Sequence, residues 1–230
     1  MNSIKIDLRD SGYPSQLINI NKPPKELYCY GNIDLLYEPS IAIIGSRNCT
    51  DYGISICKQF SKYYAENGIV VVSGLARGID GIAQREIVIN GGKTIAVLGG
   101  GINNISPKIN IELANKIIET GGLIVSEYDE DESFYAWQLH DRDRIISGLS
   151  VAVLVIEAAI PSGTAITVEY AKEQGKMVFA CPGRLDKETG MGVNEFIANG
   201  AIMALKPQDV LDKINIFKNK NLPTDKKRNR

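Results

Sequence analysis

The sequence contains few of the side chains that bind metals or carry redox chemistry. It has 230 residues with four cysteines and a single histidine, His140. The cysteines, at positions 29, 49, 57 and 181, form no CxxC pair. Zinc-ligand spacing is therefore missing, and we expect neither a metal site nor structural disulfides. Reduced thiols are typical of a cytoplasmic protein.

Long hydrophobic runs are also missing. The longest apolar run extends from Val151 to Ile160 and is interrupted by Glu157. Such a run is far too short to span a bilayer, which needs about 20 apolar residues. No charged segment followed by an apolar one opens the sequence as a secretion signal would. We therefore expect a cytoplasmic protein that makes no use of a membrane.

Neither sign of charge is in excess. Lys and Arg number 26 and Asp and Glu number 27, which gives a formal net charge of -1. A globally basic nucleic-acid-binding protein is excluded by this balance, so any nucleic-acid site must be a local patch. The one basic segment is residues 218–230, which has little to bury and is predicted to be a disordered tail.

Two common phosphate-binding motifs do not occur. No GxxxxGK[ST] segment is present, and Gly45-Ser46-Arg47 is not followed by the remainder of a dinucleotide fingerprint. Neither NAD binding nor a P-loop ATPase is supported, and we expect no cofactor.

Short apolar runs alternate with longer amphipathic stretches between residues 41 and 204. This rhythm is typical of βαβ units and of a parallel sheet that is buried on both faces. We therefore predict an α/β fold, with a doubly wound, mostly parallel, extended Rossmann-like sheet and helices on both faces. The predicted strands are 41–44, 69–72, 94–98, 123–125, 151–156, 177–180 and 201–204.

Residues that typically start or end helices lie between these predicted strands. Thr50 or Asp51 can cap a helix over about 52–67, and Ser106-Pro107 predicts a second start, with serine as the N-cap and proline at the first helical position. A third helix is expected over about 164–174. Residues 1–40 break the rhythm and are predicted to be an extended lead-in packed on the domain 41–217.

Glycines and hydroxyl side chains follow four of the predicted strands. Ligands of open α/β sheets bind at the carboxyl ends of the strands, and helix N-termini attract anions. One such turn is more often only a tight turn, so the prediction of a phosphate-binding rim depends on the recurrence and on Arg47 and Arg77. The candidate residues are Gly45, Ser46, Arg47, Ser73, Gly74, Arg77, Asp80, Gly99, Gly100, Ser162, Gly163 and Thr164.

A second cluster covers residues 140–149. On a helix, Arg142 and Arg144 would point about 200° apart, so one can bind phosphate while the other is structural. The alternative is an exposed helix whose Asp and Arg side chains pair locally. Trp137, just upstream, is either a partly buried anchor or a platform on which an unpaired base stacks. His140 is expected to be a local hydrogen-bonding residue, and no catalytic residue is predicted.

Taken in order, several segments resemble the signature series of the DprA/Smf DNA-processing family. They are Gly45-Ser46-Arg47, the run from Ser73 to Asp80, Ser126-Glu127, the run from Arg142 to Ser150, Ser162-Gly163-Thr164 and Pro182-Gly183. The match covers about residues 12–212, which we expect to form a minimal core of that family.

The resemblance implies single-stranded DNA binding in a positively charged pocket at the strand ends, homodimerisation, and the loading of a RecA-type recombinase during natural transformation. It implies that Arg142 and Arg144 join the strand-end residues around the pocket. One departure is notable: Asp143 stands where the family usually has asparagine, and Asp141 is a second acid beside the arginines. These acids should weaken the local attraction for phosphate.

Two other functions use the same fold. The segment 161–164 also resembles phosphoribohydrolases of nucleoside monophosphates, but Glu169 lies five residues after Thr164 where their pattern wants three, which turns the carboxylate by about 200° on a helix. The other alternative is a sensor that holds a free nucleotide in the same rim, because glycine, serine and arginine accept either form of phosphate.

Overall fold

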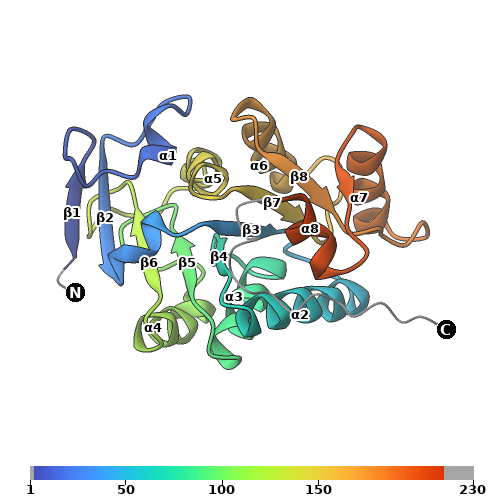
Figure 1. Ribbon diagram of the computed structural model, residues 1–230. Coiled ribbons are helices and arrows are strands. Elements are labelled where there is room, and N and C mark those ends of the chain that lie inside the picture. Colours follow the sequence, from blue (N-terminus) through green and yellow to red (C-terminus); the bar gives the residue numbers. More distant parts are fainter. Residues whose placement is uncertain (1–2, 215–230) are drawn as a thin grey trace.

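The computed structural model describes residues 3–214 and contains one sheet with helices on both faces (Figure 1). The strand order is β1-β2-β6-β5-β4-β3-β7-β8-β9. The strands from β6 to β9 in this order are parallel, and β1 and β2 are antiparallel additions at one edge. The predicted fold class is confirmed. The predicted basic tail, residues 218–230, lies outside the described residues.

All seven predicted strands are present, within one or two residues of the expected bounds. They are β3 (Ser40–Ile44), β4 (Val70–Ser73), β5 (Thr94–Val97), β6 (Leu123–Ser126), β7 (Ala152–Val155), β8 (Met177–Ala180) and β9 (Ile202–Met203). The lead-in contributes two more strands that the βαβ rhythm did not predict, β1 (Ile4–Asp7) and β2 (Glu26–Gly31), with α1 (Ser15–Ile18) between them and the 3-10 helix η1 (Ile33–Tyr37) after them.

The two faces of the sheet carry different helices because successive side chains of a strand point to opposite faces. In β3, Ala42 and Ile44 pack with α1, α5 (Gln138–Leu149), α6 (Gly163–Glu173) and α7 (Glu188–Ala198). Ile41 and Ile43 pack with α2 (Asp51–Glu66), α3 (Ile79–Ile89) and α8 (Pro207–Lys213). The α4 helix (Ile111–Glu119) covers β5 and β6 on this second face (Figure 1).

Of two helix starts that the sequence predicts, the structure contains one as expected and shifts the other. Thr50 is the N-cap of α2, and its side chain accepts a hydrogen bond from the Gly53 N–H. The predicted start at Ser106-Pro107 is wrong by one position: Pro107 itself is the cap, with extended backbone, and a short 3-10 helix, η2 (Lys108–Asn110), precedes α4. Among the described residues, no helix is long and apolar enough to cross a bilayer.

The chain order creates a switch point in the middle of the sheet. Strands β3, β4, β5 and β6 proceed outward in one direction, while β7, β8 and β9 proceed in the other. The helices that follow β3 and β7 therefore leave on opposite faces, and a crevice opens between the two strand ends. A ligand site is therefore expected at the turns after Ile44 and Val155.

Candidate functional site

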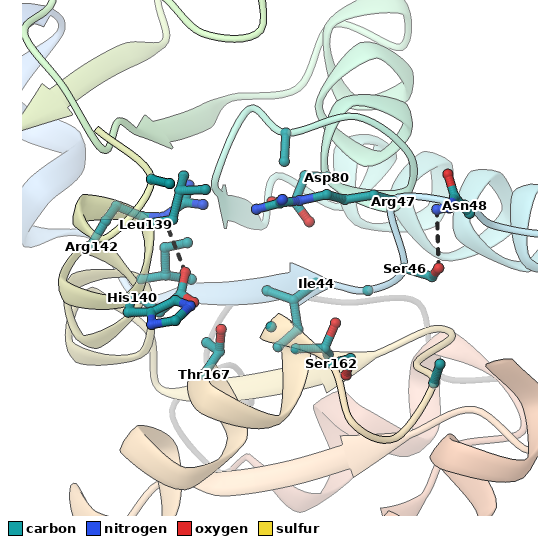
Figure 2. A pocket seen from close by; sticks show the side chains of 18 residues that line it. Ile44, Ser46, Arg47, Asn48, Asp80, Leu139, His140, Arg142, Ser162 and Thr167 are labelled. Atoms are coloured by element: carbon teal, nitrogen blue, oxygen red, sulfur yellow. Dashed lines mark hydrogen bonds and ion pairs between the residues drawn. The ribbon is translucent and has the colours of Figure 1, made fainter. Parts of the chain in front are cut away.

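A cavity of about 430 Å³ lies at this switch point, and its volume falls in the usual range of ligand-binding pockets. The turn after β3 and the start of α3 form one wall, α5 forms the second, and the N-terminus of α6 forms the third (Figure 2). Of the predicted residues, the cavity brings together Gly45, Ser46, Arg47, Asp80, Arg142, Ser162, Gly163 and Thr164. Other predicted residues lie elsewhere.

Arg47 is the exposed cation of the cavity wall. The backbone around it is held by the turn before α3: the Ile79 N–H donates to the Ser46 carbonyl at 3.1 Å. Gly78 has a φ of 73°, and a Cβ at this position would lie 2.2 Å from the Ser46 carbonyl oxygen. Only glycine allows these two turns to lie so close together. The turns therefore hold the base of Arg47, while its side chain remains in solvent.

Arg142 lines the cavity and is also bound to the protein through one side of its guanidinium. Its side chain is buried, and Nη1 donates to the carbonyls of Gly74 at 2.6 Å and Val97 at 2.8 Å. Gly74 is required for this contact, because a Cβ there would lie 1.8 Å from Nη1. Arg142 therefore joins the ends of β4 and β5 and presents only part of its guanidinium to the cavity.

Two buried carboxylates accompany Arg142. Asp143 Oδ1 lies 3.1 Å from Arg142 Nε, a contact drawn as a dashed line in Figure 2. Burial raises the pKa of Asp143 to about 6, although Arg142 and the Thr167 hydroxyl oppose the shift. Burial also raises the pKa of Asp80, which accepts hydrogen bonds from the backbone N–H groups of Gly74 and Gly45. Asp80 therefore fastens two turns at the cavity wall.

These acids correct the expectation of a positively charged pocket. The fixed charges that line the cavity are Arg47 and Arg142 against Asp80 and Asp143, which cancel formally. Anion attraction must then come from the geometry: Arg47 reaches into solvent, and the α6 N-terminus has no acidic residue in its first turn. Exposed N–H groups of such a helix end favour an anion.

Several predicted residues lie outside the cavity. Gly99 and Gly100 are covered by the segment 127–138, since a Cβ at Gly99 would lie 3.3 Å from the Gln138 carbonyl oxygen and a Cβ at Gly100 would lie 3.2 Å from Phe134 Cα. Ser73 donates to the Ile43 carbonyl inside the sheet, and Arg77 is exposed next to the cavity wall without lining it. The glycine turn after β5 is therefore a packed junction in this molecule and does not line the cavity.

Arg144 also lies outside the cavity, on the other side of α5. Its guanidinium pairs with Glu127 through contacts of 2.5 and 2.6 Å, and Nε donates to the Lys22 carbonyl at 2.7 Å. It lines a separate depression of about 510 Å³ together with lead-in residues. Trp137 is 57% exposed, stands edge-to-face against Tyr128 with ring centroids 6.1 Å apart, and does not line the cavity.

Glu157 is a structural residue of this site that sequence reasoning did not single out. It is buried, accepts from Thr50 N at 2.8 Å and from Thr50 Oγ1 at 2.6 Å, and its carbonyl accepts from Ser46 N at 2.7 Å. It thereby fixes both ends of the turn that carries Arg47. The sequence does indicate such a role, because Glu157 interrupts the longest apolar run and an acid buried there must have hydrogen-bond partners.

The cavity also takes in side chains outside the predicted set, among them His140, Asp143 and Thr167. Within residues 3–214, no group of three or more His, Cys, Asp or Glu side chains is arranged to hold a metal ion.

Comparison with known proteins assigns the family. The family model described as DNA recombination-mediator protein A matches residues 5–215. The chain belongs to this family. The DprA/Smf resemblance of the sequence is thereby confirmed.

Three relatives show the extent of the similarity. Protein Smf of Escherichia coli (strain K12) is 40% identical over 202 residues, which is 88% of this chain and 54% of that protein. The X-ray structure of DprA from Streptococcus pneumoniae has a TM-score of 0.87 at 39% identity, over 93% of this chain and 75% of that one. The chain therefore spans about half of the E. coli protein.

The third relative is DNA processing protein A from Helicobacter pylori, whose structure describes its single-stranded DNA binding mode. It has a TM-score of 0.81 at 30% identity and covers 92% of this chain and 96% of that one.

Proposed function

We propose that this member of the family binds single-stranded DNA at the cavity between the ends of β3 and β7. The observation that supports this proposal is the cavity itself: an exposed arginine, a helix N-terminus without acids and the unpartnered Ser162 hydroxyl meet at the switch point of the sheet. The single-stranded DNA binding described for the H. pylori relative agrees with it.

Each wall has a proposed contribution. Arg47 pairs with a backbone phosphate, and the N–H groups of Gly163 and Thr164 at the start of α6 receive another anionic oxygen. Arg142 and Asp80 keep the strand ends in place. Arg77, exposed beside this wall, contributes a weaker contact from outside the cavity.

We further propose that the bound strand is passed to a RecA-type recombinase and that the protein acts as a homodimer in the cytoplasm. The description of the family as a recombination mediator supports the first of these proposals. The protein is proposed to bind and not to catalyse. Glu169, the glutamate nearest to the phosphoribohydrolase pattern, is exposed and does not line the cavity.

The test is fluorescence anisotropy of labelled oligo-dT of increasing length, with equal-length duplex and mononucleotides as competitors, at two salt concentrations. Arg47→Ala should weaken binding about tenfold or more and Arg77→Ala less, because charge-assisted contacts to phosphate contribute about 1.5–3 kcal/mol. Arg85→Ala, at an exposed arginine of α3 outside the cavity, is the control.

A sensor of free nucleotides is the second candidate, because the cavity is large enough to enclose one nucleotide. The two functions differ in length dependence. A strand-binding protein gains affinity with oligonucleotide length and loses it steeply with salt, whereas a sensor saturates with a mononucleotide. Full displacement of the oligonucleotide by a mononucleotide, or indifference to Arg47, would overturn the DNA proposal.

A further inference from the structure

The floor of the cavity provides hydrogen-bond acceptors where a phosphate site would provide donors. Asp143 and Asp80 both line it, and both are at least nine-tenths buried as residues. Arg142 Nη1 donates to two carbonyl groups, and Arg142 Nε lies 3.1 Å from Asp143 Oδ1 as an ion pair without a hydrogen bond. A phosphate that entered this deeply would therefore meet two buried acids beside the single guanidinium of Arg142, whose Nη1 is already used by the protein.

Asp143 has acceptor capacity left for a ligand. A carboxylate has about four lone-pair sites. Within the described residues, the Arg142 guanidinium and the Thr167 hydroxyl approach the Asp143 carboxylate, and together they occupy about half of that capacity. By contrast, Asp80 receives two backbone N–H groups that hold the turns. Asp143 is therefore the acceptor of the cavity that a ligand can use.

The walls above the carboxylates are suited to a planar ring. Ile44, Leu139 and Ile146 line the cavity from β3 and α5. Figure 2 shows Leu139 and His140 on the α5 side and Ile44 on β3, with Ser46 by the turn after β3 and the Arg47 side chain extending from that turn past Asp80 toward α5. A nucleotide can thus leave its phosphate at Arg47 and turn its base inward, where only the edge of the base meets a polar group.

We propose that the cavity selects a base with an exocyclic amino group over thymine, with Asp143 accepting the hydrogen bond from that group. Cytosine presents an N4 amino donor where thymine presents the O4 acceptor, and Asp or Glu commonly accepts from cytosine N4. The amino group satisfies Asp143, whereas O4 places a second acceptor against a buried carboxylate. This proposal rests on the proposed single-stranded DNA function and adds a base preference to it.

The decisive comparison uses equal-length oligonucleotides of 5-methylcytosine and thymine at about pH 8. These bases have the same size and the same methyl group and differ at position 4 and at the adjoining ring nitrogen. We expect the 5-methylcytosine strand to bind at least about fivefold more tightly, since one such contact discriminates by about 1–3 kcal/mol. This measurement needs no variant, so it does not depend on the folding of a mutant.

Asp143→Asn tests the residue. An amide of the same shape can still accept from Arg142, and it can rotate to donate to thymine O4, so the preference should fall to about onefold. Asp141→Asn is the matched control, because it removes the same charge from the same helix outside the cavity and should keep the preference.

The outcomes separate the two proposals. If neither strand binds, the proposed function fails. If both strands bind equally to the unmodified protein, the DNA function stands and the base preference is wrong. Loss of the preference in Asp141→Asn would also overturn it, because a general charge effect would then explain the discrimination. If only free nucleotides show the preference, the ligand is a mononucleotide and the strand proposal fails.

Discussion

Two glycine turns at the same edge of the sheet have different fates in this molecule. The turn after β3 opens into the cavity, whereas Gly99-Gly100-Gly101 after β5 is covered by the segment 127–138. The cover is held by hydrogen bonds from Gly101 N to the Glu132 carbonyl at 3.0 Å and from Asn103 N to the Glu130 carbonyl at 2.9 Å. The same local sequence signal therefore produces a site or a junction, depending on what packs across it.

The largest effect is expected at Arg142, which lies between the open and the covered turns. Arg142→Met should lower the free energy of unfolding by about 3–5 kcal/mol, because it leaves the buried Asp143 and Asp80 without their cation and removes the donor from the Gly74 and Val97 carbonyls. Urea unfolding at neutral pH measures it. Arg85→Met is the exposed control, and a loss below about 1 kcal/mol would contradict the structural role of Arg142.

The next effect is a pH dependence of stability that arises in the cavity beside the open turn. Burial raises the pKa of Asp143 from 3.8 to about 6. Between these values the folded state holds a proton that the unfolded state has released, so stability falls as pH rises through this window. The loss is about 3 kcal/mol, at 1.36 kcal/mol for each pKa unit. Unfolding from pH 4 to 7 should show this slope.

Asp143→Asn should flatten that slope, and Asp141→Asn should leave it unchanged. The comparison of the two variants isolates Asp143 from other groups that titrate in this range, Asp80 included, since burial raises the pKa of Asp80 as well. An unaltered slope in Asp143→Asn would show that another group carries the pH dependence.

A smaller effect is expected from glycine substitutions, one in each turn, that should change stability at the covered turn and DNA binding at the open turn. In Gly101→Ala, the Cβ would lie 2.3 Å from the Asp129 carbonyl oxygen, so the cover must shift, at about 1–3 kcal/mol of stability. Trp137, the single tryptophan, lies at the end of this cover and should report the shift by fluorescence. Single-stranded DNA affinity should change less than in Arg47→Ala.

Gly45→Ala is the counterpart at the open turn, where a Cβ would lie 2.8 Å from the Glu157 carbonyl oxygen and from Ile79 Cγ1. It should displace the Arg47 turn and weaken DNA binding while leaving the Trp137 emission unchanged. If both variants change both signals, the two turns are coupled and the distinction between them fails.

The fold was predictable because its central strands are buried on both faces and are separated by helix-length segments. The edge strands were missed for a local reason. β1 is only four residues long, and although Ile4 and Ile6 alternate with Lys5 and Asp7, its pairing with β2, from Ile4 with Cys29 to Asp7 with Glu26, joins residues that are far apart in the sequence.

The candidate site was predictable only where the signal was local. The turn after β3 and the start of α6 carry their own glycine and hydroxyl residues, and the structure brings them together. The positions of the two arginine side chains depend on groups that are distant in the sequence. Arg142 donates to the carbonyls of Gly74 and Val97, and Arg144 contacts Glu127 and the lead-in. Helix geometry separates these arginines but cannot show which of them faces a cavity.

Trp137 gives the smallest predicted effect and tests whether the covered turn also takes part in binding. The residue is 57% exposed, and its ring already makes an edge-to-face contact with Tyr128. Stacking on a base contributes about 1–3 kcal/mol, and the acidic residues around Trp137 should keep its value at the low end. Trp137→Leu should therefore weaken binding by less than about tenfold, and only for oligonucleotides long enough to extend beyond the cavity.

The same experiment has an internal readout, because a base stacked on Trp137 quenches its fluorescence. Long oligonucleotides should quench the emission and short ones should not, whereas Arg47→Ala should weaken binding at every length. Equal affinity of Trp137→Leu at all lengths, without quenching in the unmodified protein, would confine DNA to the open turn. The segment 127–138 would then serve only as the cover that distinguishes the two turns.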